Sequence, residues 1–130
     1  MSFFKYSEFQ HRDKMDPFTI DTLELFRGDL GFPIILTADA CTGGHSSDSW
    51  HYYDDATGKK GKAVDGTTEA PLWDFIFKAR KAGFVGIGVY LQDGLLRYFH
   101  LDTRNTAPTF WLGIVKSPTV TQYIYKLGGK

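Results

Sequence analysis

The sequence predicts an α+β fold in which an antiparallel sheet packs against two main helices. Apolar residues recur at helical spacing in two segments, one ending at Gly31 and the other at Gly83. An Asp93-Gly94 step lies between two runs of β-forming residues, which is the strongest short-range signal for a hairpin. Two helices together with an antiparallel sheet make up an α+β fold.

The first helix is expected to begin at Asp16-Pro17. Asp16 can accept hydrogen bonds from the free amides of the first turn, and Pro17 suits the first helical position. One helical face is then marked by apolar residues at i, i+3 and i+7, namely Leu23, Phe26 and Leu30. Gly31 is a natural stop, and the apolar run at 33–37 indicates a short buried strand.

Residues 38–62 form a long stretch rich in glycine and serine with little apolar periodicity. Loops of this length in compact domains are usually functional or disordered. A brief strand at 62–65 is expected to leave the loop. Thr67 or Thr68 can cap the second helix, which Gly83 ends.

The remaining segments predict strands. Residues 84–92 and 95–101 flank the Asp-Gly turn, and further strands are expected at 109–115 and 122–126. The length of 130 residues suits one compact domain and is short for two. We therefore expect residues 1–130 to form a single domain.

Composition excludes several classes of protein. Lysine and arginine total 15, as do aspartate and glutamate, so the surplus of cations that non-specific nucleic-acid binding requires is missing. The one cysteine, Cys41, excludes an intramolecular disulfide. No apolar run approaches the roughly 18 residues of a membrane span, and the N-terminus lacks the apolar core of a signal peptide. We expect no nucleic-acid partner, no membrane span, and synthesis in the cytoplasm.

A small set of histidines and aspartates could support metal chemistry. His51 lies in the long loop, and alternation puts Asp102 on the same face of a strand as His100. Asp65 closes a strand with an apolar centre, and a buried carboxylate needs a partner. Two imidazoles and one carboxylate make a three-ligand zinc site with a fourth position for water. From spacing alone, packed histidines and an Asp65 that caps the following helix remain open alternatives.

Three short motifs occur in a specific order: Ser-Trp-His at 49–51, Gly-Lys-Ala-Val-Asp at 61–65 and Phe-His-Leu-Asp at 99–102. They resemble the Ser-x-His, Gly-x-Ala-x-Asp and His-x-Asp signatures of the zinc D-alanyl-D-alanine carboxypeptidase family. That family includes murein endopeptidases and phage lysins, and its fold is shared with the hedgehog signalling domain. The resemblance runs along nearly the whole chain, from the opening Phe-x-x-x-Glu-Phe at 4–9 to the Trp-Leu at 111–112.

This resemblance implies a hedgehog-like fold with Zn²⁺ bound by His51, Asp65 and His100. Asp102 would orient a ligand, and it is also a candidate catalytic group together with His45. The implied function is hydrolysis of an amide bond in peptidoglycan peptides by a metal-activated water, in the manner of a carboxypeptidase or an endopeptidase. A monomer of phage or prophage type is expected, which is virion-associated or released to the cell wall by a phage system.

The chain departs from the family pattern at four places. His51 and Asp65 stand fourteen positions apart, twice the usual step. Ala40 occupies the place where relatives carry an arginine that binds a substrate carboxylate, and Arg97 the place where many carry an acidic general base. Gly66 replaces an apolar residue. The missing arginine and the missing acid favour an alternative, a catalytically inactive cell-wall-binding or virion structural module that retains the fold.

Two further readings have less support. Cys41 could pair with a histidine as a nucleophile, but no clear helix follows it to activate the thiol. The Gly-Ile-Gly at 86–88 lacks the third glycine of a dinucleotide-binding loop, because Leu91 stands at that position.

Overall fold

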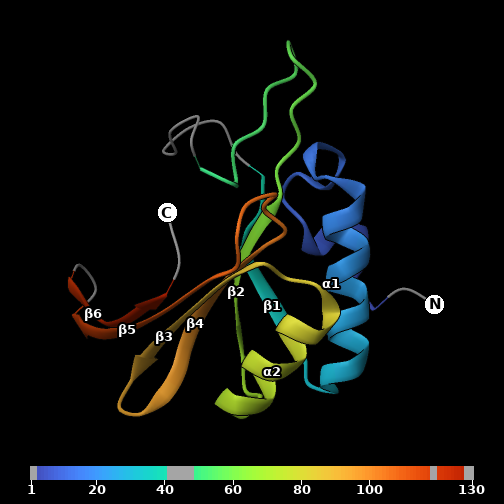
Figure 1. Ribbon diagram of the computed structural model, residues 1–130. Helices are drawn as coiled ribbons and strands as arrows, with labels where there is room; N and C mark the ends of the chain where they lie inside the picture. The colour runs from blue at the N-terminus through green and yellow to red at the C-terminus, as the bar shows by residue number, and fades with distance from the viewer. Residues whose placement is uncertain (1–2, 41–48, 118–119, 128–130) are drawn as a thin grey trace.

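The computed structural model describes residues 3–40, 49–117 and 120–127, with side chains up to residue 123 (Figure 1). α1 and α2 lie on one face of the sheet (Figure 1). The described residues form the following elements, in chain order: η1 (Tyr6–Glu8), η2 (Arg12–Lys14), α1 (Pro17–Leu30), β1 (Ile34–Ala38), β2 (Ala63–Thr68), α2 (Leu72–Ala82), β3 (Gly86–Gln92), β4 (Leu95–Asp102), β5 (Thr109–Ser117) and β6 (Val120–Leu127). The expected α+β class with two main helices is confirmed.

The sheet is mixed rather than wholly antiparallel. Its strand order is β1-β2-β4-β3-β5-β6, and all neighbours pair antiparallel except β3 and β5. β4 already has β3 on one side and β2 on the other, so the chain crosses through residues 103–108 to the free side of β3. Two reversals of direction, at the hairpin and at this crossing, make β5 parallel to β3. The predicted antiparallel sheet is therefore wrong at this pair.

Local signals set the first helix as expected. The Asp16 side chain accepts a hydrogen bond from the backbone N–H of Phe18, and Pro17 occupies the first helical position. Gly31 ends α1 in the left-handed conformation with φ of 77°, where a side chain would be strained. The Asp93-Gly94 turn joins β3 to β4, which confirms the predicted hairpin.

The second helix begins differently from the prediction. Thr67 and Thr68 belong to β2, which is longer than expected, and Pro71 precedes the first residue of α2. The Thr68 hydroxyl donates to the carbonyl of Pro33, so it joins β2 to the start of β1 instead of capping a helix. Asp65 consequently lies within β2 and does not end it.

Aromatic rings join the helices to the sheet. The ring of Phe75 on α2 lies 5.3 Å from Phe26 on α1 and 4.8 Å from Phe99 on β4, measured between centroids. All three side chains are fully buried. Because side chains alternate along a strand, the burial of Phe99 and Leu101 against the helices turns His100 to the opposite face.

No helix in the described part of the chain is long and apolar enough to cross a membrane. Each of the two helices buries one face against the core and exposes the other. On α2, for example, Phe75 is buried while Phe77, two residues further on, is 71% exposed.

This contrast gives a test of the core. Phe75→Ala should lower the free energy of unfolding by about 3–5 kcal/mol, because it leaves a cavity between three elements. Phe77→Ala on the same helix should change it by about 0.5 kcal/mol or less, because the ring is exposed. Urea denaturation followed by circular dichroism measures both. Equal losses in the two variants would contradict this packing.

Candidate metal centre

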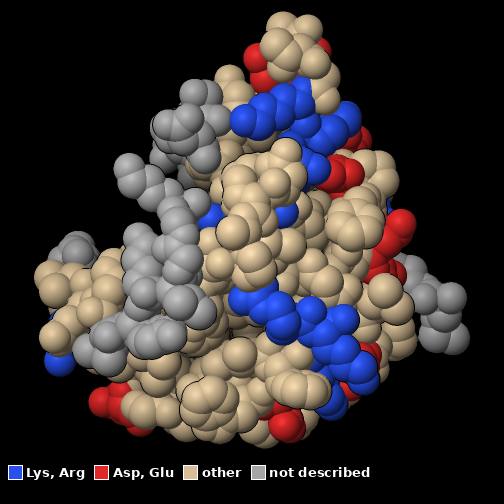
Figure 2. All heavy atoms as spheres, in the orientation of Figure 1, with Lys and Arg blue, Asp and Glu red and all other residues tan. Residues whose placement is uncertain are grey.

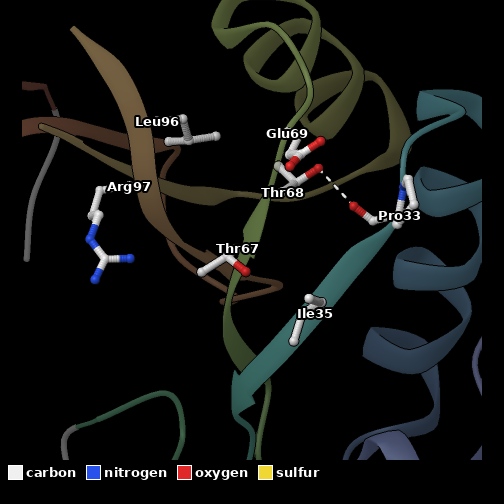
Figure 3. Close-up of a pocket in the computed structure, with 7 residues that line it drawn as sticks. All are labelled: Pro33, Ile35, Thr67, Thr68, Glu69, Leu96 and Arg97. Atoms are coloured by element: carbon white, nitrogen blue, oxygen red, sulfur yellow. Dashed lines mark hydrogen bonds between the residues drawn. The ribbon is translucent and has the colours of Figure 1, made fainter. Parts of the chain in front are cut away.

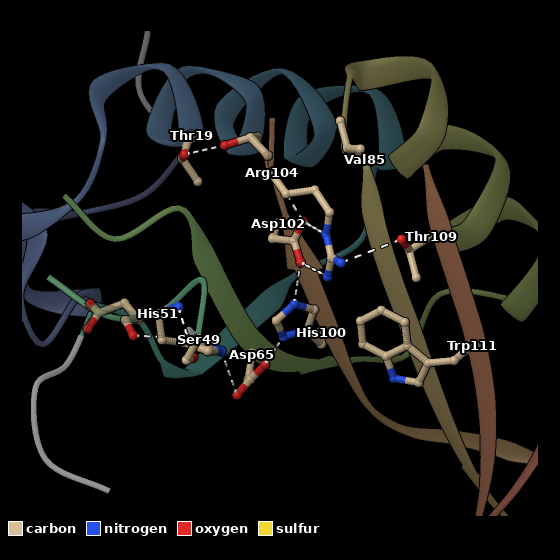
Figure 4. Close-up of polar contacts among 12 residues, drawn as sticks. Thr19, Ser49, His51, Asp65, Val85, His100, Asp102, Arg104, Thr109 and Trp111 are labelled. Atoms are coloured by element: carbon tan, nitrogen blue, oxygen red, sulfur yellow. Dashed lines mark hydrogen bonds and ion pairs between the residues drawn. The ribbon is translucent and has the colours of Figure 1, made fainter. Parts of the chain in front are cut away.

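Asp65 and His100 are direct partners across the ladder between β2 and β4. Both side chains lie on the sheet face away from the helices, because the neighbouring pair Val64 and Leu101 is buried in the core. Oδ1 of Asp65 lies 3.0 Å from Nδ1 of His100 (Figure 4). Two hydrogen-bonded strands thus fix the spacing of these two groups.

His51 reaches the same place from the segment that precedes β2. Its Nδ1 donates to the backbone carbonyl oxygen of Asp39 at 2.9 Å, since a carbonyl can only accept. Its backbone N–H donates to the hydroxyl of Ser49 at 3.2 Å. With Nδ1 engaged, Nε2 faces Oδ2 of Asp65 at 3.3 Å. The 3% exposure of His51 leaves the ring little freedom to move away.

These three side chains form a group that could hold a metal ion. The ligand atoms of His51, Asp65 and His100 all lie within 4.8 Å of one another. Two imidazole nitrogens and one carboxylate oxygen suit Zn²⁺ and other divalent transition metals. The predicted meeting of these residues is confirmed, and the geometry leaves the identity of the metal open.

His100 also contacts a buried ion pair between Asp102 and Arg104. Nε2 of His100 lies 2.7 Å from Oδ2 of Asp102, which is fully buried. Arg104 binds the same carboxylate through Nε at 2.8 Å and Nη2 at 2.7 Å (Figure 4). Asp102 therefore lies on the side of His100 away from Asp65. This is the arrangement by which a carboxylate orients a metal-binding histidine.

The Asp102 carboxylate occupies space that only a glycine on the neighbouring strand leaves free. Gly86 is its partner in the ladder between β3 and β4. A Cβ atom at Gly86 would overlap the Asp102 carboxylate. The ring of Trp111 packs beside the His100 ring, with 5.2 Å between their centroids (Figure 4). The orientation of His100 is therefore set by packing as well as by hydrogen bonds.

The pKa values follow from these contacts. Burial alone would raise the pKa of the Asp65 carboxyl, but hydrogen bonds from His100 and His51 hold it well below its ordinary value. Burial likewise opposes ionisation of Asp102, and hydrogen bonds from Arg104 and His100 lower its pKa despite this. Burial would lower the pKa of His100, yet its bonds to Asp102 and Asp65 raise it to about 9. Without metal, a protonated His100 lies between two carboxylates.

The metal group opens into a pocket of about 290 Å³. Its lining residues are Ser49, His51, Asp65, Tyr90, Tyr98 and His100. The rings of Tyr90 and Tyr98 stack with centroids 4.4 Å apart, and the Tyr90 hydroxyl accepts a hydrogen bond from Nε1 of Trp111 at 2.7 Å. Burial raises the pKa of Tyr90, so its hydroxyl keeps its proton at neutral pH.

The extra residues between His51 and Asp65 project away from the site. Asp54 and Lys59 form an isolated β-bridge, and the segment around them extends as a narrow finger above the sheet (Figure 1). Basic side chains gather where the finger joins the body of the molecule (Figure 2). There Lys60 donates to the backbone carbonyl of Asp13, and Lys62 pairs with Asp16. The doubled spacing is therefore compatible with the convergence of His51 and Asp65.

The other candidate residues have different outcomes. The role of Asp102 as a catalytic acid or base stays a prediction, and its observed contacts are those of an orienting group. His45 and Cys41 lie outside the described residues. Ala40 is fully buried and presents no charged group to the pocket.

Sequence reasoning missed four residues of the site: Asp39, Tyr90, Tyr98 and Arg104. Asp39 acts here through its backbone carbonyl, so its side chain carries no signal. Arg104 stands two residues after Asp102, and this Asp-x-Arg spacing could have suggested a pair. Counting back from the Asp-Gly turn would pair Tyr90 with Arg97, whereas a bulge pairs it with Tyr98.

The ligand set can be tested by metal content. The wild-type protein, purified without chelator or nickel, should contain about one divalent ion per chain, as a three-ligand site implies. His51→Ala and His100→Ala should lose it, because two protein ligands remain. His11→Ala is the matched control and should retain the ion, since His11 contacts the Asp39 carboxylate instead of the pocket. Elemental analysis measures all four proteins, and metal loss in the control would contradict this ligand set.

Metal affinity should depend steeply on pH. Metal can bind Nδ1 of His100 only after that ring loses a proton, and its pKa is about 9. Below pH 9 the proton competes with the metal, so affinity should rise about tenfold per pH unit from pH 7 and then level off above pH 9. Titration calorimetry in two buffers of different ionisation enthalpy counts the released proton. An affinity that stays flat over this range would show that His100 is not a ligand.

Comparisons with known proteins gave no significant match. No family model matches the sequence. No curated protein and no solved structure is significantly similar to the chain. The metal group, its supporting ion pair and its pocket are consequently the features from which a function can be inferred.

Proposed function

We propose that the protein is a zinc-dependent peptidase that hydrolyses an amide bond in peptidoglycan peptides. The observation that carries the proposal is the convergence of His51, Asp65 and His100 within 4.8 Å at an open pocket. Three protein ligands with an open position distinguish catalytic zinc sites from closed structural ones. The three motifs that resemble the D-alanyl-D-alanine carboxypeptidase family support the choice of peptidoglycan peptides as the substrate class.

The protein's own residues would prepare the site for this chemistry. Bound zinc supplies a water of lowered pKa and a Lewis acid for the scissile carbonyl. Asp102 and the Asp39 carbonyl fix which nitrogens of His100 and His51 face the pocket. The Tyr90 hydroxyl lines the same pocket in its protonated form, in reach of a polar substrate group there.

A general base has to come from outside the three metal ligands. Among the described residues that line the pocket, Asp65 is the one carboxylate, and it belongs to the ligand set. Asp102 is fully buried behind His100. His45 stays a candidate because it belongs to the same segment of sequence as His51.

One observation favours a second candidate function, a wall-binding or virion structural module without turnover. Many members of the resembled family carry an acid three residues before the last histidine, where this chain carries Arg97. Such a module would keep the fold and the metal. Zinc content together with cleavage separates the two proposals.

Cleavage of purified peptidoglycan tests the proposal. The zinc-loaded protein should release new amino termini and shortened peptides, detected by chromatography and mass spectrometry of the digest. A chelator should abolish the release and added zinc should restore it, because the nucleophile depends on the metal. His100→Ala should reduce cleavage to background, and His11→Ala should keep it. Stoichiometric zinc with no cleavage of any wall preparation would favour the non-catalytic module.

A further inference from the structure

A second pocket begins where β2 and β4 separate. The ladder between them joins Ala63–Gly66 to Phe99–Asp102 and then stops. Beyond it, Thr67 and Thr68 pair only with β1, and Leu95–Tyr98 pair only with β3. The strands diverge there, and the gap between them is a pocket of about 410 Å³ (Figure 3). Two strand edges without a partner among the described residues therefore face each other across it.

The gap adjoins the metal centre along both strands. On β2, Asp65 lines the metal pocket and Thr67 lines the gap. On β4, Tyr98 lines the metal pocket and the adjacent Arg97 lines the gap. A chain lying in the gap thus has one end beside the metal ligands.

A β-bulge turns Arg97 into this gap. Tyr90 pairs with Tyr98 and the next residue, Leu91, pairs with Leu96, so Arg97 is an extra residue on β4. Leu96 packs against the core, whereas Arg97 is exposed. Arg97 lies on the β4 side of the pocket, and Ile35 of β1 lies on the other side (Figure 3). Arg97 makes no ion pair with any residue in the described part of the chain.

The residues that line this pocket differ in charge from one side to the other. Pro33, Ile35 and Leu96 provide an apolar surface between the charged residues. Glu69 lies on the other side of the gap from Arg97 (Figure 3). A carboxylate on an occupant is attracted to the Arg97 side and repelled from the Glu69 side. Unpaired strand edges favour an occupant in extended conformation, which adds to a sheet through its backbone.

We propose that the gap between β2 and β4 binds an extended peptide segment whose carboxylate pairs with Arg97. The peptide lies against the free edges of Thr67–Thr68 and Leu95–Tyr98, and it leads one of its amide bonds to the metal centre. The inference rests on the proposed function for the identity of this peptide, a peptidoglycan stem peptide. It assigns Arg97 a role in specificity, at the position where the resembled family carries an acid.

Binding is measured on metal-free protein, so that cleavage does not intervene. The probes are a synthetic peptidoglycan stem tetrapeptide with free carboxylates and the same peptide with the carboxylates converted to amides. The free form should bind about tenfold more tightly, the value of one charge-assisted hydrogen-bonded pair. Arg97→Gln should remove this difference and leave binding of the amide form unchanged. Lys116→Gln, which removes an exposed cation on β5, is the matched control and should change neither affinity.

Hydrogen exchange locates the peptide. Amides of 67–68 and 95–98 should exchange more slowly when the free-carboxylate peptide is added, in wild type and in Lys116→Gln. Equal losses of affinity in Arg97→Gln and Lys116→Gln would overturn the proposal, because they would show a general charge effect. Protection elsewhere would overturn it too. Protection of the same edges on raising protein concentration without peptide would assign the gap to a second copy of this chain.

The failure of this inference can be told apart from failure of the proposed function. With zinc bound, Arg97→Gln should raise KM for the free-carboxylate peptide about tenfold and leave kcat unchanged. If the peptide binds in the gap and the zinc-loaded protein never cleaves it, the peptidase proposal falls and the gap assignment stands. If cleavage occurs and Arg97→Gln changes neither KM nor binding, the gap assignment falls and the peptidase proposal stands.

Discussion

The buried carboxylate of Asp102 is the group on which the arrangement of the site depends. It has no access to solvent, so its charge must be balanced inside the protein. Arg104 and His100 provide that balance through three hydrogen bonds of 2.7–2.8 Å. The adjoining Thr103 also contacts Thr19 of α1, with hydroxyls 2.6 Å apart. Residues 102–104 thus link the end of β4 to the following crossing and to the first helix.

The two faces of the sheet have different roles because of strand alternation. One face gives Phe99 and Leu101 to the core against α1 and α2, and the other carries Asp65 and His100. A one-residue slip of β2 against β4 would turn Asp65 toward the core and Val64 away from it, so Asp65 would no longer meet His100. The core therefore stabilises the register that holds the candidate metal ligands Asp65 and His100 together. Stability and site geometry are two results of the same pairing.

Features encoded within a few residues could be predicted, and features that depend on distant pairings could not. The cap at Asp16, the stop at Gly31 and the Asp-Gly hairpin are local signals, and all three are present. β5 pairs with β3 because β2 already occupies the other side of β4. The bulge at Arg97 depends on how β3 and β4 fit together. The order of the three motifs predicts the metal group, whereas the inserted finger doubles the usual spacing of His51 and Asp65.

The placement of β2 beside β4 has a consequence for the order of folding. The β3–β4 hairpin closes through a two-residue turn, so it can form early and carries His100 with it. β2 joins this hairpin only after the chain of α2 has been closed into a loop, which costs conformational entropy. Asp65 therefore meets His100 late. The hairpin can therefore form before the candidate metal ligands come together.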